Sequence, residues 1–302
     1  MRHNVLVLDP WIVQRCFSNL GAVMSTKKCV LLSALAILAP LLAHGRADEQ
    51  PAADKPDDAP QSEDAKARSK FMMEALAEYQ VDVDEAGEVR RPKLVPAPAL
   101  RWTNTVSGTK DGVVGVWTSG GRPDVVAQFA GYGSLWIHHF ESTSLAPLTM
   151  QRNGRKMWAP RAPGIVLRPI PDAPAPADTA VKRQTQMRRL AERFEITDDF
   201  HPIYQDPKTE RHTLRLLTKP LYRYEATGDL IDGALYGYVL ATDPEALLMI
   251  EAYKTSAGAE WRYALAPMTV YGLIAKLDGK EIWNRPENRT WKIDDSCCVG
   301  SH

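Results

Sequence analysis

Two short hairpin signals constrain the fold more than any other feature of this sequence. Asn153-Gly154 and Asp278-Gly279 each separate two runs of strand-forming residues. Asn-Gly and Asp-Gly favour type I′ turns, because both central residues of such a turn have positive φ. Strands joined by two residues are antiparallel, since a parallel pair needs a crossover of about a dozen residues or more. The sequence therefore predicts an antiparallel sheet built from hairpins.

Strand-like runs fill most of the chain after residue 112, and helical spacing occurs in two places. A short amphipathic helix is predicted over 67–80, and a longer one begins after Asp178 or Thr179, with Met187, Leu190 and Phe194 on its apolar stripe. No internal repeat is evident in the sequence. We expect an α+β fold, a predominantly antiparallel, hairpin-rich, curved sheet with one long amphipathic helix packed on it. The strand-like runs are 113–117, 125–129, 134–140, 148–152, 156–158, 213–217, 234–240, 247–253, 261–265, 273–277 and 280–283.

The first 47 residues carry the pattern of a secretory signal. Lys27 and Lys28 precede an apolar run over 29–43, and Gly45-Arg46-Ala47 places small residues at a cleavage site. The run is shorter than the roughly 20 residues that a membrane span needs. We expect 24–47 to be a signal peptide, 1–23 to be a gene-model extension, and the product to be periplasmic or extracellular with no stable membrane span after cleavage. The alternative is an N-terminal anchor that is never cut.

Composition limits what the exported chain can be. Residues 48–302 have a formal charge of −4, which gives no basic footprint for a nucleic-acid partner. Their only cysteines are Cys297 and Cys298, so the chain is not a disulfide scaffold. We expect a flexible leader over 48–66, a single α+β domain over 67–285 and a loose tail over 286–302. The alternative is that the proline-rich stretch over 160–176 separates two domains, 70–170 and 178–285.

Six sequence phrases occur in a characteristic order between residues 121 and 264. In this order they resemble an uncharacterised family of exported planctomycete proteins, over about residues 70–285. The resemblance implies export and one family-wide domain, and it implies no activity, ligand or catalytic residue. The phrases are GRPDVVA at 121–127, PAPA at 174–177 leading into QMR at 186–188, LRLL at 214–217 through PLYRY at 220–224, DGAL at 232–235, TDPE at 242–245 running into LMIEA at 248–252, and WRYA at 261–264.

One polar stretch offers candidate chemistry, in a chain that has no GxSxG, HExxH, CxxC, P-loop or GxGxxG motif. Within His138-His139-Phe140-Glu141, strand alternation puts His139 and Glu141 on the same face. A histidine and a carboxylate so placed can bind a metal or form an acid–base pair. The alternative is that one histidine packs beside aromatic residues and the other faces solvent. The candidate catalytic residues are His139 and Glu141, the candidate metal ligands are His138, His139, Glu141 and His201, with Asp198 or Asp199 as other third ligands, and no cofactor is predicted.

Other reactive or aromatic side chains favour structural roles. Asp232, Asp243, Glu245 and Glu251 lie near turns or strand ends, where acidic residues commonly shape the chain. The tryptophans of a strand-rich protein favour the core, and the arginine-rich helix face favours solvent over an acidic polymer or a membrane surface. Cys297-Cys298 could form a vicinal disulfide or link two chains, and we expect neither.

These observations predict a non-catalytic exported domain that binds a protein or an envelope component, with no nucleic-acid partner. The alternative is a secreted hydrolase or a metal-dependent enzyme that uses His138, His139 and Glu141.

Overall fold

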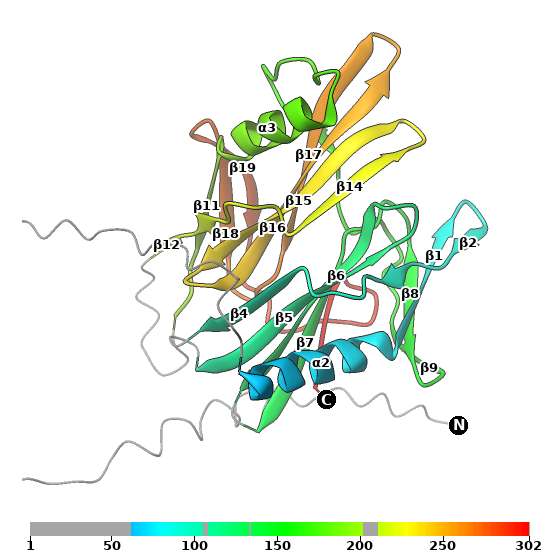
Figure 1. Cartoon of the computed structure of the whole chain (residues 1–302), viewed down its shortest axis with the longest axis vertical. Coiled ribbons are helices and arrows are strands. Elements are labelled where there is room, and N and C mark those ends of the chain that lie inside the picture. Colours follow the sequence, from blue (N-terminus) through cyan, green and yellow to red (C-terminus); the bar gives the residue numbers. More distant parts are fainter. Residues whose placement is uncertain (1–61, 105–107, 133, 202–210, 302) are drawn as a thin grey trace, which may run out of the picture. The chain divides into compact units, whose positions relative to one another are not determined.

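The computed structural model describes residues 62–302 except 105–107, 133, 202–210 and 302 (Figure 1). The predicted gene-model extension, signal peptide and most of the leader lie outside the described residues. Contacts divide the chain into two units, Met1–Glu63 and Asp64–His302, and every strand of the described chain belongs to the second unit. No helix in the described part of the chain is long and apolar enough to cross a membrane.

The described chain contains two helices and twenty strands, all strand pairs being antiparallel. The first group of elements is α2 (Glu63–Ala77), β1 (Tyr79–Glu85), β2 (Glu88–Arg90), β3 (Lys93–Leu94), β4 (Leu100–Asn104), β5 (Thr109–Thr118), β6 (Pro123–Tyr132), β7 (Leu135–Ser142), β8 (Leu148–Arg152), β9 (Arg155–Trp158) and β10 (Arg168–Pro169). The second group is α3 (Ala180–Ala191), β11 (Phe194–Asp198), β12 (His212–Thr213), β13 (Arg215–Leu216), β14 (Tyr222–Thr227), β15 (Leu230–Leu240), β16 (Asp243–Thr255), β17 (Gly258–Pro267), β18 (Leu273–Leu277), β19 (Lys280–Arg285) and β20 (Cys297–Ser301).

The strands form four sheets, which we call A to D. Sheet A has the order β2-β1-β8-β9, and sheet D has the order β12-β11-β18-β19. Sheet B has the order β20-β7-β6-β5-β3 with β4 also on β5, and sheet C has the order β10-β17-β16-β15-β13 with β14 also on β15. The antiparallel, hairpin-rich α+β fold is therefore confirmed. In place of one long helix on a single curved sheet, the chain has helices of 15 and 12 residues and four sheets.

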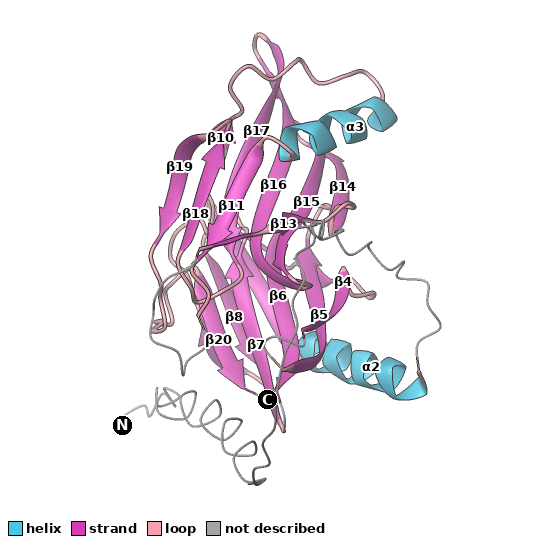
Figure 2. Ribbon diagram, turned by 90° about the vertical axis from the view of Figure 1, so that its left-hand side faces the viewer, coloured by secondary structure: helices cyan, strands magenta, loops and turns pink. Residues whose placement is uncertain are grey.

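The sheets show that the chain contains one topology twice. From α2 to β9, the first two and the last two strands form sheet A, and the middle five belong to sheet B. From α3 to β19, the corresponding strands form sheets D and C in the same order. We call these segments the first half and the second half; Figure 2 shows α2 beside β4 and β5 and α3 beside β14 to β16. This repeat was not evident from the sequence.

Strand register aligns the two halves residue by residue. Trp102 pairs with Gly112 in the first half as Tyr224 pairs with Gly233 in the second. Met150 pairs with Trp158 as Ala275 pairs with Trp283, each next to a bulge. Identical residues at aligned positions include Arg68/Arg183, Met72/Met187, Arg101/Arg223, Asp111/Asp232, Gly112/Gly233, Pro123/Pro244, Tyr132/Tyr253, Trp136/Trp261, Leu148/Leu273, Gly154/Gly279 and Trp158/Trp283.

A buried aspartate ties the helix to the sheet in both halves. Asp111 accepts hydrogen bonds from Arg68 of α2 and from Arg101 of β4. Asp232 accepts them from Arg183 of α3 and Arg223 of β14, at 2.9 Å each. In each half, two arginine side chains donate hydrogen bonds to one buried carboxylate, so its negative charge is compensated. Asp232 therefore has a structural contact in the fold, as expected from its place beside a turn.

A glycine in each half lets an aromatic ring cross the neighbouring strand. A Cβ on Gly112 would collide with the ring of Trp102, and a Cβ on Gly233 would collide with the ring of Tyr224. We expect Gly233→Ala to lower the free energy of unfolding by about 1–3 kcal/mol, because the buried ring must move. Urea denaturation measures this loss. The exposed Thr227→Ala on the same strand pair is the control, and an equal loss for both variants would contradict the explanation.

The two halves exchange their last strands. After β9 the chain runs to β10, which pairs with β17 of the second half. After β19 it runs to β20, which pairs with β7 of the first half over five residue pairs. The prediction of a loose tail over 286–302 is therefore wrong for residues 297–301. The segment contains little strand-forming sequence, and its order comes from pairing with a strand more than 150 residues away.

Three apolar cores hold this arrangement together. The first lies within the first half and includes Met72, Trp117 and Phe140. The second consists of residues of the second half, such as Met187 and Trp261, together with Ile170 from the connection before α3. The third joins sheets B and C and takes residues from both halves. Trp102, Trp117, Trp158 and Trp261 are buried, as expected for core tryptophans, whereas Trp136, Trp283 and Trp291 are only partly buried. The candidate site described below lies on the face of sheet B that contributes to this third core.

A buried ion pair also joins the halves. The Nε atom of Arg122, just ahead of β6, lies 3.0 Å from Oε1 of Glu251 on β16. The Tyr224 and Tyr253 hydroxyls donate hydrogen bonds to the two carboxylate oxygens at 2.6 and 2.8 Å. Arg122 also donates to the carbonyl oxygen of Thr143. Glu251 therefore has structural partners, in line with the sequence-based expectation.

Candidate metal centre

Three side chains of types that can bind a metal ion meet where β7 pairs with β20. His139 and Glu141 share one face of β7, as strand alternation requires. Cys297 of β20 is the register partner of Glu141. One nitrogen, one oxygen and one sulfur ligand atom from these residues all lie within 4.8 Å of one another. We call His139, Glu141 and Cys297 the His-Glu-Cys cluster.

The cluster is buried, and its nitrogen and oxygen ligand atoms are poorly satisfied, whereas Arg285 interacts with the Cys297 thiol. Glu141 is 0% exposed, Cys297 5% and His139 8%. Among the described residues, Nε2 of His139 has no hydrogen-bond partner and the Glu141 oxygens have no well-aligned one, although Ser296 and Arg285 lie close enough to Glu141 to favour its charged form. Leaving buried polar groups unpaired costs about 1–3 kcal/mol each, and more for charged groups. A ligand that accepts their lone pairs would remove this cost.

Burial sets the protonation of the three groups. It lowers the pKa of His139 to about 4, with the nearby Arg285 cation acting in the same direction. It raises the pKa of Glu141 well above its usual value, although the Arg285 cation partly opposes that rise. It also raises the pKa of Cys297 to about 11, with the Glu141 charge as the next cause. Burial therefore favours the uncharged forms of all three side chains when no metal is bound.

This donor set suits a transition-metal ion. Zinc binds imidazole nitrogen, thiolate sulfur and carboxylate oxygen, and three protein ligands leave a fourth position for a smaller molecule. Calcium and magnesium prefer oxygen ligands, which here come from Glu141 alone. Metal ions bind the thiolate and carboxylate forms, so protons held by the Cys297 thiol and the Glu141 carboxyl group would be released on metal uptake.

Two predicted ligands lie elsewhere. His138 faces the other side of β7, where its Nε2 atom lies 2.8 Å from the Tyr79 hydroxyl and its ring stacks on Phe129. His201 contacts the Asp199 carbonyl oxygen through Nδ1, and it packs on Tyr271. Neither belongs to the His-Glu-Cys cluster, and neither do the alternative third ligands Asp198 and Asp199.

The third member of the cluster, Cys297, could not be identified from the sequence, where neither cysteine has a predicted role. Both cysteines are free, and as strand neighbours they face opposite sides of β20, with Cys298 packed against the core that contains Phe140. No local pattern predicts which strand the end of the chain will pair with, so the contact of Cys297 with Glu141 has no sequence signal.

The second half shows what the framework needs at these positions. Gln128 pairs with His139 as Met249 pairs with Ala264, and Val126 pairs with Glu141 as Leu247 pairs with Ala266. Both alanines belong to the core between sheets B and C. Strand register aligns Arg168 of β10 with Gly300 of β20. Three residues before each of them stand Ile165, which belongs to the same core, and Cys297, so Ile165 takes the place of Cys297. The same fold therefore packs with apolar residues where the first half has the His-Glu-Cys cluster.

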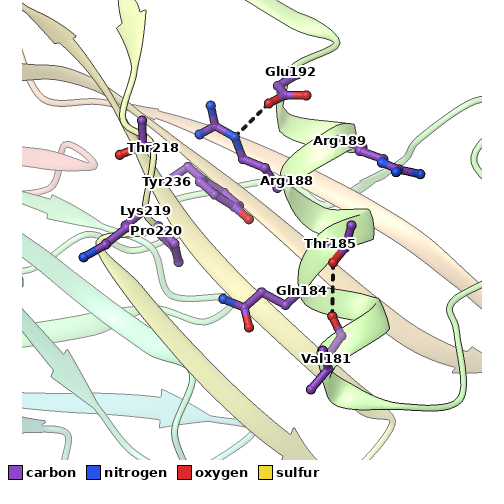
Figure 3. A pocket seen from close by; sticks show the side chains of 10 residues that line it. All are labelled: Val181, Gln184, Thr185, Arg188, Arg189, Glu192, Thr218, Lys219, Pro220 and Tyr236. Carbon is purple, nitrogen blue, oxygen red and sulfur yellow. Dashed lines mark hydrogen bonds and ion pairs between the residues drawn. The ribbon is translucent and has the colours of Figure 1, made fainter. Parts of the chain in front are cut away.

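A groove lies beside α3 in the second half. It has a volume of about 470 Å³ and lies between α3, Tyr236 and residues 218–220. In Figure 3, Gln184 and Arg188 extend from α3 toward this side, while Arg189 points away from it. Tyr236 aligns with Gly115, on which Leu76 of α2 packs closely.

Three further carboxyl groups, Asp198, Asp243 and Glu245, form what we call the carboxyl cluster. Burial raises the pKa of Asp198 to about 7 and that of Asp243 to about 8, and the charges of neighbouring carboxylates add to both shifts. Burial also raises the pKa of Glu245 well above its usual value, with Asp243 and Asp198 contributing. The side chain of Gln128 donates to Oδ1 of Asp243 at 3.4 Å. These groups favour their protonated forms in the folded protein.

Comparison of the chain with protein-family models, with curated proteins and with solved structures gives no match. The geometry of the His-Glu-Cys cluster is therefore the basis for a functional proposal.

Proposed function

We propose that the chain is an exported, non-catalytic binding protein that holds one transition-metal ion, zinc being the best fit, at the His-Glu-Cys cluster. The observation that carries this proposal is the set of three buried ligand atoms within 4.8 Å of one another. The secretory pattern of residues 24–47 supports export. The resemblance to exported planctomycete proteins also predicts export.

The internal repeat supports a ligand at this place. A framework that packs with Ala264 and Ala266 does not need a buried histidine and glutamate for its stability. Burying the His139 and Glu141 side chains in the first half therefore costs folding free energy, which a bound ion would offset. Because the three side chains are almost completely covered, the cluster suits holding an ion better than admitting a substrate, which favours binding over the alternative of a metal-dependent enzyme.

We expect the purified protein to bind about one zinc ion per chain at neutral pH. Cys297→Ser, Glu141→Gln and His139→Gln should each lower zinc affinity by more than about 100-fold, since even outer-shell changes cost 10–100-fold. Elemental analysis after dialysis gives the stoichiometry, and competition with a chromogenic chelator gives the affinity. Proton release in weakly buffered solution reports deprotonation of the ligands.

Matched variants separate ligand loss from misfolding. Cys298→Ser and His201→Gln change the same residue types outside the cluster and should keep wild-type zinc affinity. The double variant His139→Ala/Glu141→Ala copies the second half, so it should fold and bind no zinc. Less than a tenth of an equivalent of zinc on the wild-type protein, or equal affinity in cluster and control variants, would refute the proposal.

A further inference from the structure

The ligands of the His-Glu-Cys cluster come from two strands that are far apart in the chain. His139 and Glu141 lie on β7, an internal strand of sheet B, and Cys297 lies on β20, the edge strand next to it. Apart from β7, β20 has no strand partner among the described residues. An ion bound to all three side chains would therefore cross-link the edge of the sheet to its interior.

The segment before β20 is attached to the first half by only a few polar contacts. The amide of Ser142 donates to the Ser296 carbonyl oxygen at 2.9 Å, and Nε1 of Trp158 donates to the Asp295 carbonyl oxygen at 2.8 Å. The amide of Ala159 donates to the carbonyl oxygen of Ile293 at 2.6 Å. Edge strands that make few buried contacts open at a lower free energy than internal strands.

Opening of β20 would relieve the metal-free cluster. When β20 leaves β7, water reaches Nε2 of His139, which has no hydrogen-bond partner in the closed structure, and the Glu141 carboxyl group, whose burial is only partly offset by Ser296 and Arg285. The same opening separates Cys297 from the other two ligands. Closing therefore costs free energy at this position without the ion, and only the closed arrangement offers all three ligands to it.

We propose that the metal ion acts as a lock on β20: the strand stays paired with β7 while the ion is bound and can separate when the ion is removed. This inference rests on the proposed function. An ion that binds only the closed state stabilises that state by a factor of about 1 + [L]/Kd. At a free zinc concentration of about 100 times Kd, opening becomes about 100-fold rarer.

Hydrogen exchange of the full chain, with and without zinc, tests the lock. We expect amides of residues 137–141 and 297–301 that exchange through opening of β20 to slow about 100-fold at about 100 times Kd. Amides of the β15–β16 pair, in the other six-stranded sheet, serve as the internal reference and should not change. Cys298→Ser should retain the zinc effect, and Cys297→Ser should lose it.

The possible results distinguish the two proposals. If zinc binds with the expected stoichiometry but exchange of 137–141 and 297–301 is unchanged, the lock is refuted and the metal site stands. An equal slowing throughout sheets B and C would also refute the lock, because it indicates global stabilisation. Absence of zinc binding would refute both the lock and the proposed function.

Discussion

Arg122→Ala is expected to lower the free energy of unfolding by about 3–5 kcal/mol, the range found when one partner of a buried ion pair is removed. The side chains of Arg122 and Glu251 are 11% and 0% exposed, so water does not replace the lost guanidinium. The two tyrosine hydroxyls remain as hydrogen-bond donors, but they carry no positive charge. Urea denaturation followed by circular dichroism measures the change.

Two further variants make this prediction specific. Arg91→Ala removes an arginine that is 71% exposed and paired with Asp82 at 2.7 Å, so it should cost no more than about 1 kcal/mol. Adding Glu251→Gln to Arg122→Ala should recover part of the loss, because a neutral amide needs no cationic partner. Similar losses for Arg122→Ala and Arg91→Ala would show that the buried pair does not join the halves as described.

The carboxyl cluster is expected to make the protein less stable as pH rises. The folded protein holds the Asp198 and Asp243 protons up to about pH 7 and 8, because burial raises the pKa of each, whereas an unfolded aspartate loses its proton near pH 4. Between these values the folded state binds more protons than the unfolded state, so the free energy of unfolding falls with pH by about 1.4 kcal/mol per pH unit for each such carboxyl. This stabilisation is complete below about pH 4 and is lost by about pH 8.

Asp243→Asn isolates the contribution of one carboxyl group. Its neutral amide resembles the protonated acid, so the variant should match the wild type near pH 4 and unfold at a higher temperature at about pH 8.5. Thermal melts between about pH 4 and 9 measure the difference. Asp229→Asn, an exposed aspartate in the turn before β15, should leave the pH dependence unchanged. A wild-type melting temperature that is flat or rises between about pH 5 and 8 would contradict the role assigned to the cluster.

Local sequence patterns predicted the hairpins well because their cause is local. Asn153, Gly154, Asp278 and Gly279 all have positive φ, between 50° and 81°, as type I′ turns require. Both predicted helices occur, with shifted ends, because apolar spacing marks the face that packs on a sheet. The helix predicted over 67–80 begins at Glu63 and ends at Ala77, so the last residues of the predicted leader are helical. Ser62 immediately before it and the acidic Glu63 and Asp64 in its first turn form an N-terminal pattern that apolar spacing alone does not detect.

The repeat and the full candidate site depend on contacts between distant residues. The halves share residues at turns, ion pairs and tryptophans, but these are a few positions among many that differ. Strand alternation was enough to place His139 and Glu141 on one face. It could not supply Cys297, because the pairing of β20 with β7 is set by the path of the chain after β19 rather than by any pattern in residues 297–301.

The exchange of β10 and β20 makes the two copies of the topology mutually dependent. Each six-stranded sheet is completed by a strand whose covalent connection leads from the other copy. Dividing the chain between the copies would leave unpaired backbone along β7 and β17, the kind of bare edge that promotes aggregation. The duplicated architecture is thus an interlocked pair rather than two modules in tandem, and neither copy is a natural unit for excision or recombination.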